Sequence, residues 1–219
     1  MSIQIIGTSG VIADVDGTTY RALKITNRPC DYGLRGSYRL GVTTGTINAT
    51  LTNGSIFQFY WPSYIATALV WGVSVDYCGS STLANFQVFK LLFERYVTAF
   101  GTGGTLIAVP GTTGQSQQIR TFMRSSLAAP VRIATTAALG NGTWTEDANA
   151  IGSLTYTVDG IGINTNPIKG LRLYGSLGKR TGAPIVLAAS EALNINLTTT
   201  TTPTFVVGVN IAWSEVGAY

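Results

Sequence analysis

Apolar and polar residues alternate along most of the chain, and this period of two limits the fold more than any other feature. Successive side chains on an extended strand point to opposite faces, so alternation gives a strand one apolar face and one polar face. Gly, Asn, Pro and Thr separate the alternating segments. The pattern predicts an all-β fold, an antiparallel β-sandwich that is jelly-roll-like and contains at most one short helix. The most regular segment is the last, with one face made of Phe205, Val207, Val209, Ile211 and Trp213.

Residues 55–61 form a second clear strand pattern, in which Phe57, Phe59 and Trp61 share one face. Residues 83–100 are ambiguous, because their aromatic residues recur at intervals of three and four, which is a helical stripe. Aromatic and β-branched residues nevertheless favour strands, so we expect a strand there. The residues of the stripe are Phe86, Phe89, Phe93, Tyr96 and Phe100.

Two turns are predicted from local chemistry. Asn141-Gly142 is the preferred pair for a type I′ turn, because both central positions need positive φ, and it predicts a hairpin joining residues 133–139 to 143–145. The tract Thr198–Thr202, followed by Pro203, is expected to be an exposed turn before the last strand.

The chain has 219 residues, a length at which a single domain buries roughly 70% of its unfolded surface. We therefore expect one β-sandwich domain over residues 1–219, with residues 1–34 forming either an N-terminal arm or extra strands. No internal repeat of fixed period is visible. Residues 1–10 have neither a basic region nor a long apolar stretch, so no membrane association is expected.

Charged residues make up 11% of the chain, less than half of the usual share of roughly 25%. A low charge density reduces the electrostatic cost of packing many copies side by side. The net charge is +4, but the basic residues are scattered and Lys179-Arg180 is their only adjacent pair, so nucleic acid is not an expected partner. The densest basic region contains Arg21, Lys24, Arg28, Arg35 and Arg39.

The sequence contains no histidine, which excludes Ser-His-Asp and Cys-His catalysis and histidine-containing zinc sites. Cys30 and Cys78 have no metal-binding or redox spacing and are expected to be reduced thiols. The adjacent Glu146 and Asp147 are expected to lie in a solvated turn. Asp14 and Asp16 supply too few oxygens for calcium, which takes roughly six to eight. We therefore expect no enzyme activity and no catalytic, cofactor or metal site.

Three further sequence patterns are candidates for binding sites. The glycine-rich segments 101–105 and 111–114 lack the spacing of a phosphate-binding loop. Tyr60, Trp61, Tyr64 and Trp71 could be core residues, a sugar-stacking platform or a contact between subunits, and the sequence leaves these alternatives open. The Asn-x-Ser/Thr triplets are interpreted as chance products of the composition; they begin at Asn48, Asn53, Asn141 and Asn196.

Several short motifs resemble a family of tailed-bacteriophage virion structural proteins, and they follow one another in the same order over roughly residues 35–216. The segment Asn166–Arg180 has no counterpart among them. The motifs are Gly36–Leu40, Ser55–Phe59 with Trp61, Gly103–Thr105, Arg132-Ile133, Pro184–Ala188 with Glu191, and Val207–Val216.

The resemblance implies a capsid decoration, or cement, protein of the virion, assembled in the cytoplasm of the bacterial host. It implies that the major capsid protein and further copies of this chain, as a homotrimer, are its partners. No catalytic residue is carried over. Two alternatives stay open: a receptor- or carbohydrate-binding module of a tail or head fibre, and the major shell subunit of a jelly-roll virus.

Overall fold

A computed structural model describes residues 36–64, 66–79, 87–97, 101–107, 116–118, 131–140, 145–158, 168–175, 183–200 and 202–217. The chain divides into two compact units, Met1–Tyr32 and Gly33–Tyr219, and every described residue belongs to the second. The predictions for residues 1–34, including those for Asp14, Asp16 and Cys30, lie outside the described residues.

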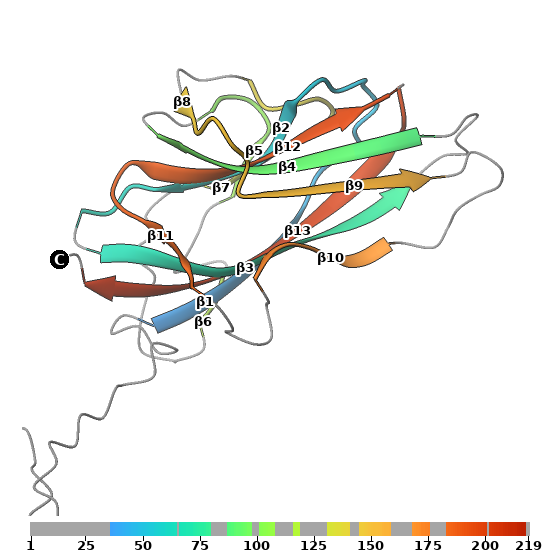
Figure 1. Cartoon of the computed structure of the whole chain (residues 1–219). Helices are drawn as coiled ribbons and strands as arrows, with labels where there is room; N and C mark the ends of the chain where they lie inside the picture. Colours follow the sequence, from blue (N-terminus) through green and yellow to red (C-terminus); the bar gives the residue numbers. More distant parts are fainter. Residues whose placement is uncertain are drawn as a thin grey trace, which may run out of the picture. The chain divides into compact units, whose positions relative to one another are not determined.

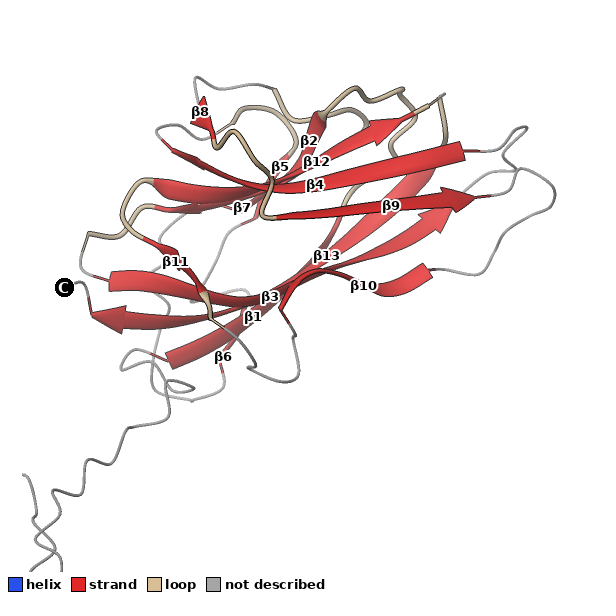
Figure 2. Cartoon of the chain, viewed as in Figure 1, coloured by secondary structure: helices blue, strands red, loops and turns tan. Residues whose placement is uncertain are grey.

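Strands make up all of the regular structure in the described ranges (Figure 2). No helix long and apolar enough to cross a membrane occurs among these residues. The strands are β1 (Gly36–Thr43), β2 (Gly54–Trp61), β3 (Ala66–Gly79), β4 (Gln87–Val97), β5 (Thr105–Ile107), β6 (Ser116–Gln118), β7 (Val131–Ile133), β8 (Thr145–Glu146), β9 (Gly152–Val158), β10 (Ile168–Gly175), β11 (Ile185–Leu187), β12 (Glu191–Thr199) and β13 (Phe205–Gly217).

The strands form two antiparallel sheets that pack face to face (Figure 1). The six-stranded sheet has the order β10-β3-β13-β1-β6, and β11 also pairs with β3. The seven-stranded sheet has the order β5-β7-β2-β12-β4-β8, and β9 also pairs with β4. The structure therefore confirms the predicted antiparallel β-sandwich.

The pairing of the main strands is nested. β1 pairs with β13, β2 with β12, β3 with β10 and β11, and β4 with β8 and β9. Such nesting describes one long hairpin rolled up into two sheets, which is the jelly-roll arrangement. The rolling brings β13 beside β3 and β12 beside β4, so the last two strands lie inside the sheets.

The tip of this long hairpin, between β4 and β8, returns to the start of the roll. β7 pairs with β2 and also with β5, whereas β6 pairs with β1. One continuous segment therefore extends both sheets beyond β1 and β2.

The core lies between the sheets and is built from the inward faces of the alternating strands. Phe59 of β2 packs edge-on against Trp213 of β13, with ring centroids 5.2 Å apart, and Tyr77 of β3 lies 4.7 Å from Phe89 of β4. Each aromatic side chain buries a large apolar area and contributes roughly 1.5–3 kcal/mol. The predicted face of β13 is confirmed, because its five alternating apolar residues are all buried.

Residues 87–97 are a strand, as the aromatic composition predicted. Phe89 and Phe93 point into the core, whereas Tyr96 lies on the opposite face of β4. The helical interpretation is therefore wrong for residues 87–97, because the three described members of the aromatic stripe divide between the two faces of one sheet.

The predicted hairpin around Asn141-Gly142 is also wrong. β7 ends at Ile133 and pairs with β2, whereas β8 begins at Thr145 and pairs with β4. β7 buries Val131 and Ile133 in the core beside the aromatic residues of β2, and this burial outweighs the local turn preference. The pair Asn141-Gly142 itself lies outside the described residues.

The threonine tract is only partly an exposed turn. Thr198 and Thr199 are the last residues of β12, and Thr199 is buried. Their hydroxyls accept hydrogen bonds from the backbone N–H groups of Asn53 (3.0 Å) and Leu51 (2.9 Å). Two of the threonines therefore fasten the loop between β1 and β2 to the end of β12.

Candidate functional site

The four aromatic residues considered as a platform do not share a surface. Trp61 is fully buried and donates its indole N–H to Ala66 O (2.8 Å), while Trp71 is 6% exposed and donates to Ser214 Oγ (2.9 Å). Tyr64, in the loop between β2 and β3, is 78% exposed. Two of the four residues are therefore structural, and Tyr64 is the one most available to a partner.

The glycine-rich segment after β4 is held by polar groups of β2 and β7. Gly101 N donates to Gln58 Oε1 (3.0 Å), and Arg132 Nη1 donates to Gly103 O (2.8 Å). Thr102 and Gly140 exchange two backbone hydrogen bonds. Backbone amides of this segment thus donate hydrogen bonds within the chain. The second glycine-rich segment, residues 111–114, lies outside the described part of the chain.

Glu146 and Asp147 point to different surroundings. Asp147 is exposed and accepts a hydrogen bond from Arg95 Nε (3.0 Å), in an ion pair of the kind that stabilises a fold by about 0–1 kcal/mol. Glu146 lies in β8, is half-buried and bonds to side chains of β12. The prediction of a solvated turn is therefore wrong for Glu146.

Glu146 belongs to a group of polar side chains on the outward face of the seven-stranded sheet, which we call the carboxyl–amide cluster. The cluster contains Asn194 and Asn196 of β12, whose neighbours Leu193, Ile195 and Leu197 point the other way, into the core. Four of its members are less than one-tenth exposed. The members are Ser55, Glu94, Glu146, Asn194 and Asn196.

Amide N–H groups in the cluster point at carboxyl oxygens. Asn196 Nδ2 donates to Glu94 Oε2 (2.6 Å) and to Glu146 Oε1 (3.0 Å). Asn194 Nδ2 donates to the same Glu146 oxygen (2.9 Å) and to Asn196 Oδ1 (2.8 Å), and Ser55 Oγ donates to Asn194 Oδ1. Two carboxyl groups from different strands therefore converge on one amide nitrogen.

The surroundings of Glu94 disfavour its charged form. Burial raises the pKa of the Glu94 carboxyl above its usual range, and repulsion from Glu146 raises it further. The hydrogen bond from Asn196 and the positive charge of Lys90 lower the same pKa and offset part of the increase. The pKa of the neighbouring Tyr96 is also raised, mainly by burial and then by Tyr60 and Glu146.

The cluster continues into a polar row that crosses four strands. Arg132 of β7 pairs with Gln58 of β2, Gln58 with Asn194 of β12, and Asn194 with Glu94 of β4. Gln58 is fully buried, and its Nε2 has no hydrogen-bond partner among the described residues. The row has a cation at one end and a carboxyl pair at the other.

The chemistry open to this cluster is the uptake and release of a proton. Among the described residues, no three or more histidine, cysteine or acidic side chains gather as metal ligands. The amide donors already occupy carboxyl oxygens that would face an ion, and Glu94 is only 8% exposed. Burial and the neighbouring Glu146 make Glu94 hold a proton more readily than an isolated glutamate does.

A second buried carboxyl lies at the end of β13. Glu215 accepts a hydrogen bond from Trp213 Nε1 (3.2 Å), and Trp213 stacks on Tyr38 with ring centroids 5.4 Å apart. The pKa of Tyr38 is raised by burial and by the nearby Glu215. These three residues stabilise the pairing of β1 with β13 rather than presenting groups to a ligand.

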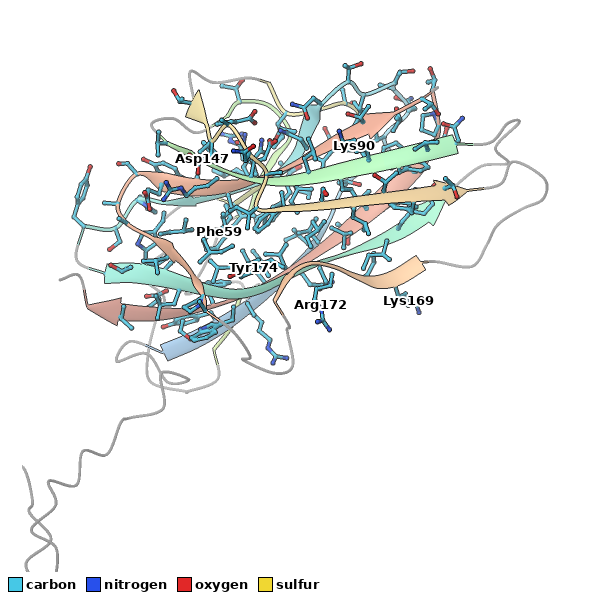
Figure 3. All side chains as sticks on the ribbon, viewed as in Figure 1. Phe59, Lys90, Asp147, Lys169, Arg172 and Tyr174 are labelled. Atoms are coloured by element: carbon cyan, nitrogen blue, oxygen red, sulfur yellow. The ribbon has the colours of Figure 1, made fainter. Side chains whose placement is uncertain are left out.

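Exposed apolar side chains lie on or beside the edge strands of both sheets. Val186 lies on β11 and Leu106 on β5, and Ile151 directly precedes β9. Edge strands have unpaired backbone groups and are natural places for another chain to bind. Figure 3 shows the contrast between Phe59 and Tyr174, which lie between the sheets, and Lys169 and Arg172, which point away from them.

The sequence did not reveal the cluster. Asn194 and Asn196 alternate with apolar residues, which is the usual pattern of a strand with a solvated face. The available signal is the pair of asparagines on one face of β12. Their burial depends on β8, which pairs with β4 although the two strands are far apart in the sequence.

Comparison with known proteins found that no protein-family model and no curated protein matches the chain.

Proposed function

We propose that this chain is a structural subunit of a tailed-bacteriophage particle, a decoration protein that attaches to the major capsid protein and to other copies of itself as a homotrimer. The observation that carries the proposal is the nested, jelly-roll pairing of the strands. Jelly rolls recur in viral capsid proteins and lectin domains, where a rigid sandwich presents edges and loops to partners.

The surface of the chain supports the same proposal. Charged residues are few, and exposed apolar side chains lie at sheet edges rather than in one large patch. Each such contact would be modest, but symmetric copies on a capsid add their contacts, so attachment is strong as a whole.

The test is reconstitution on capsids. The purified chain would be mixed with capsids built from the major capsid protein encoded alongside it, and particles with and without the chain compared by electron cryomicroscopy. We expect ordered additional density at symmetric positions on the capsid surface. Absence of the chain from purified virions, together with no added density after mixing, would contradict the proposal.

The strand order also favours a second function, the major shell subunit of a jelly-roll virus. The two functions differ in what the chain does alone, because a shell subunit assembles into closed particles without another protein. Size-exclusion chromatography and electron microscopy of the purified chain separate them. Closed particles indicate a shell subunit, and trimers that bind only to a preformed capsid indicate a decoration protein.

A further inference from the structure

The attachment of β8 to the seven-stranded sheet is unusually small. β8 has two residues, Thr145 and Glu146, which pair with Val97 and Tyr96 at the end of β4. Beyond it, Asp147 N donates to Arg95 O (2.9 Å) and Ile151 N donates to Phe93 O (2.7 Å). Because the pairing of β8 with β4 is so short, it contributes few hydrogen bonds. Side-chain contacts must therefore supply much of the attachment of β8 to the sheet.

Those side-chain contacts come from the carboxyl–amide cluster. Glu146 is the member that β8 contributes, and it is held by Nδ2 of both Asn194 and Asn196. Asn196 Nδ2 is shared with Glu94 of β4. Two ionised carboxylates this close repel each other, and a proton on Glu94 removes that repulsion.

We propose that the carboxyl–amide cluster is a proton-dependent clasp that fastens β8 to the sheet. The clasp is closed when Glu94 holds a proton taken from solvent, and it loosens when Glu94 and Glu146 are both ionised. The inference concerns the stability of one segment and does not depend on the proposed function.

The groups around Glu94 support this behaviour from each packed strand. β12 donates the uncharged amide of Asn196 to it, β8 contributes the carboxyl of Glu146, and β4 itself contributes Lys90. Tyr60 of β2 raises the pKa of the neighbouring Tyr96. Lys90 lowers the pKa of Glu94 by less than Glu146 raises it, and the pKa of Glu94 stays above its usual range.

The direction of the pH dependence follows from this raised pKa. The folded state binds the Glu94 proton more tightly than the unfolded state, so the proton stabilises the fold. That contribution is fully present below the ordinary glutamate pKa of about 4.3 and is lost as the pH rises through the higher folded value. The clasp is therefore tightest in acid and loosest at neutral and alkaline pH.

Hydrogen exchange of the full chain tests the clasp. The reporters are the backbone amides of Asp147 and Ile151, measured between pH 4 and pH 8 (~1-unit steps) and corrected for the intrinsic pH dependence of exchange. We expect their protection to fall as the pH rises, about tenfold for each unit by which the Glu94 pKa is raised. Protection that does not change with pH in the wild-type chain would overturn the proposal.

Glu94→Gln provides the decisive variant, because glutamine imitates the protonated carboxyl and still accepts from Asn196. We expect this variant to keep high protection across the whole range. Asp147→Asn is the matched control: it removes an exposed carboxyl of the same segment and should retain the wild-type pH response. An unchanged pH response in Glu94→Gln would sink the idea.

Circular dichroism distinguishes loosening of β8 from loss of the fold, since only the second changes the strand signal. If Glu94→Gln does not fold, Glu146→Gln removes the second carboxylate and should weaken the pH response, leaving the part that burial of Glu94 causes. A pH response as large as in the wild-type chain would overturn the clasp.

Discussion

Gly152, at the start of β9, lies against the backbone of β10 in the other sheet. A Cβ atom at this position would clash with the backbone oxygen of Leu173 in β10. Because the obstacle is backbone rather than a flexible side chain, relief requires movement of a strand. The absence of a side chain at Gly152 thus allows β9 of one sheet to approach β10 of the other sheet closely.

Gly152→Ala is expected to destabilise the fold by about 1–3 kcal/mol, since an added methyl group in a tight contact forces a backbone shift. Thermal unfolding followed by circular dichroism measures the change. Ser153→Ala, at the next and exposed position, should leave the unfolding temperature nearly unchanged. Equal effects of the two substitutions would mean that the close contact with Leu173 does not exist.

The hydroxyl of Thr199 makes a similar residue-level contribution. It accepts a buried hydrogen bond from Leu51 N, so Thr199→Val leaves that N–H without this partner and should cost about 1–3 kcal/mol. Thr200→Val is the matched control, because Thr200 is exposed and accepts a longer bond (3.3 Å) from Val88 N. Chemical denaturation of the two variants should give clearly different midpoints.

At the scale of elements, alternation predicted which segments become strands and which faces they bury. It succeeded for β2 and β13, where the predicted apolar faces, Phe57, Phe59 and Trp61 in β2 and the alternating residues from Phe205 to Trp213 in β13, are buried in the core. The strand at β4 was predicted from its aromatic composition instead. It could not predict the partners of β7 and β8, because a local turn signal such as Asn141-Gly142 contains no information on distant apolar neighbours. The burial of Asn194 and Asn196 was missed for the same reason.

The pairing of β7 with β2 can be tested through its buried residue Ile133, which lies opposite Phe57. Ile133→Ala leaves a cavity in the core and should lower the free energy of unfolding by about 2–5 kcal/mol. Leu106→Ala, in the adjacent β5 but exposed, should have little effect. If Ile133→Ala were as mild, β7 would not belong to the core of the sandwich.

At the scale of the whole molecule, the described residues form one sandwich with an apolar core between the sheets, a buried polar cluster on the outward face of one sheet and exposed apolar side chains on or beside edge strands. The sequence predicted the sandwich architecture, and its composition shows directly that charged residues are few. It did not predict which residues would be left exposed, because Tyr60, Trp61, Tyr64 and Trp71 look alike until the fold separates them.

The proposed attachment to capsids can be tested by substituting one exposed residue, Tyr64. Because it is 78% exposed, Tyr64→Ala should leave the unfolding temperature unchanged while lowering the number of copies bound per capsid severalfold. Quantitative gel analysis of purified particles measures the bound copies. Unaltered occupancy would remove Tyr64 from the attachment surface.

The nested pairing has a consequence for how the chain is made. β13 is synthesised after all the other described strands, yet it is a central strand that pairs with both β1 and β3. Contacts between residues so distant in sequence form slowly, and a nascent chain lacking β13 leaves one edge of β1 and one edge of β3 without a partner strand and the core open. The sandwich therefore closes only after β13 has been synthesised, and a chain truncated before β13 would be a target for chaperones and proteases rather than a smaller folded protein.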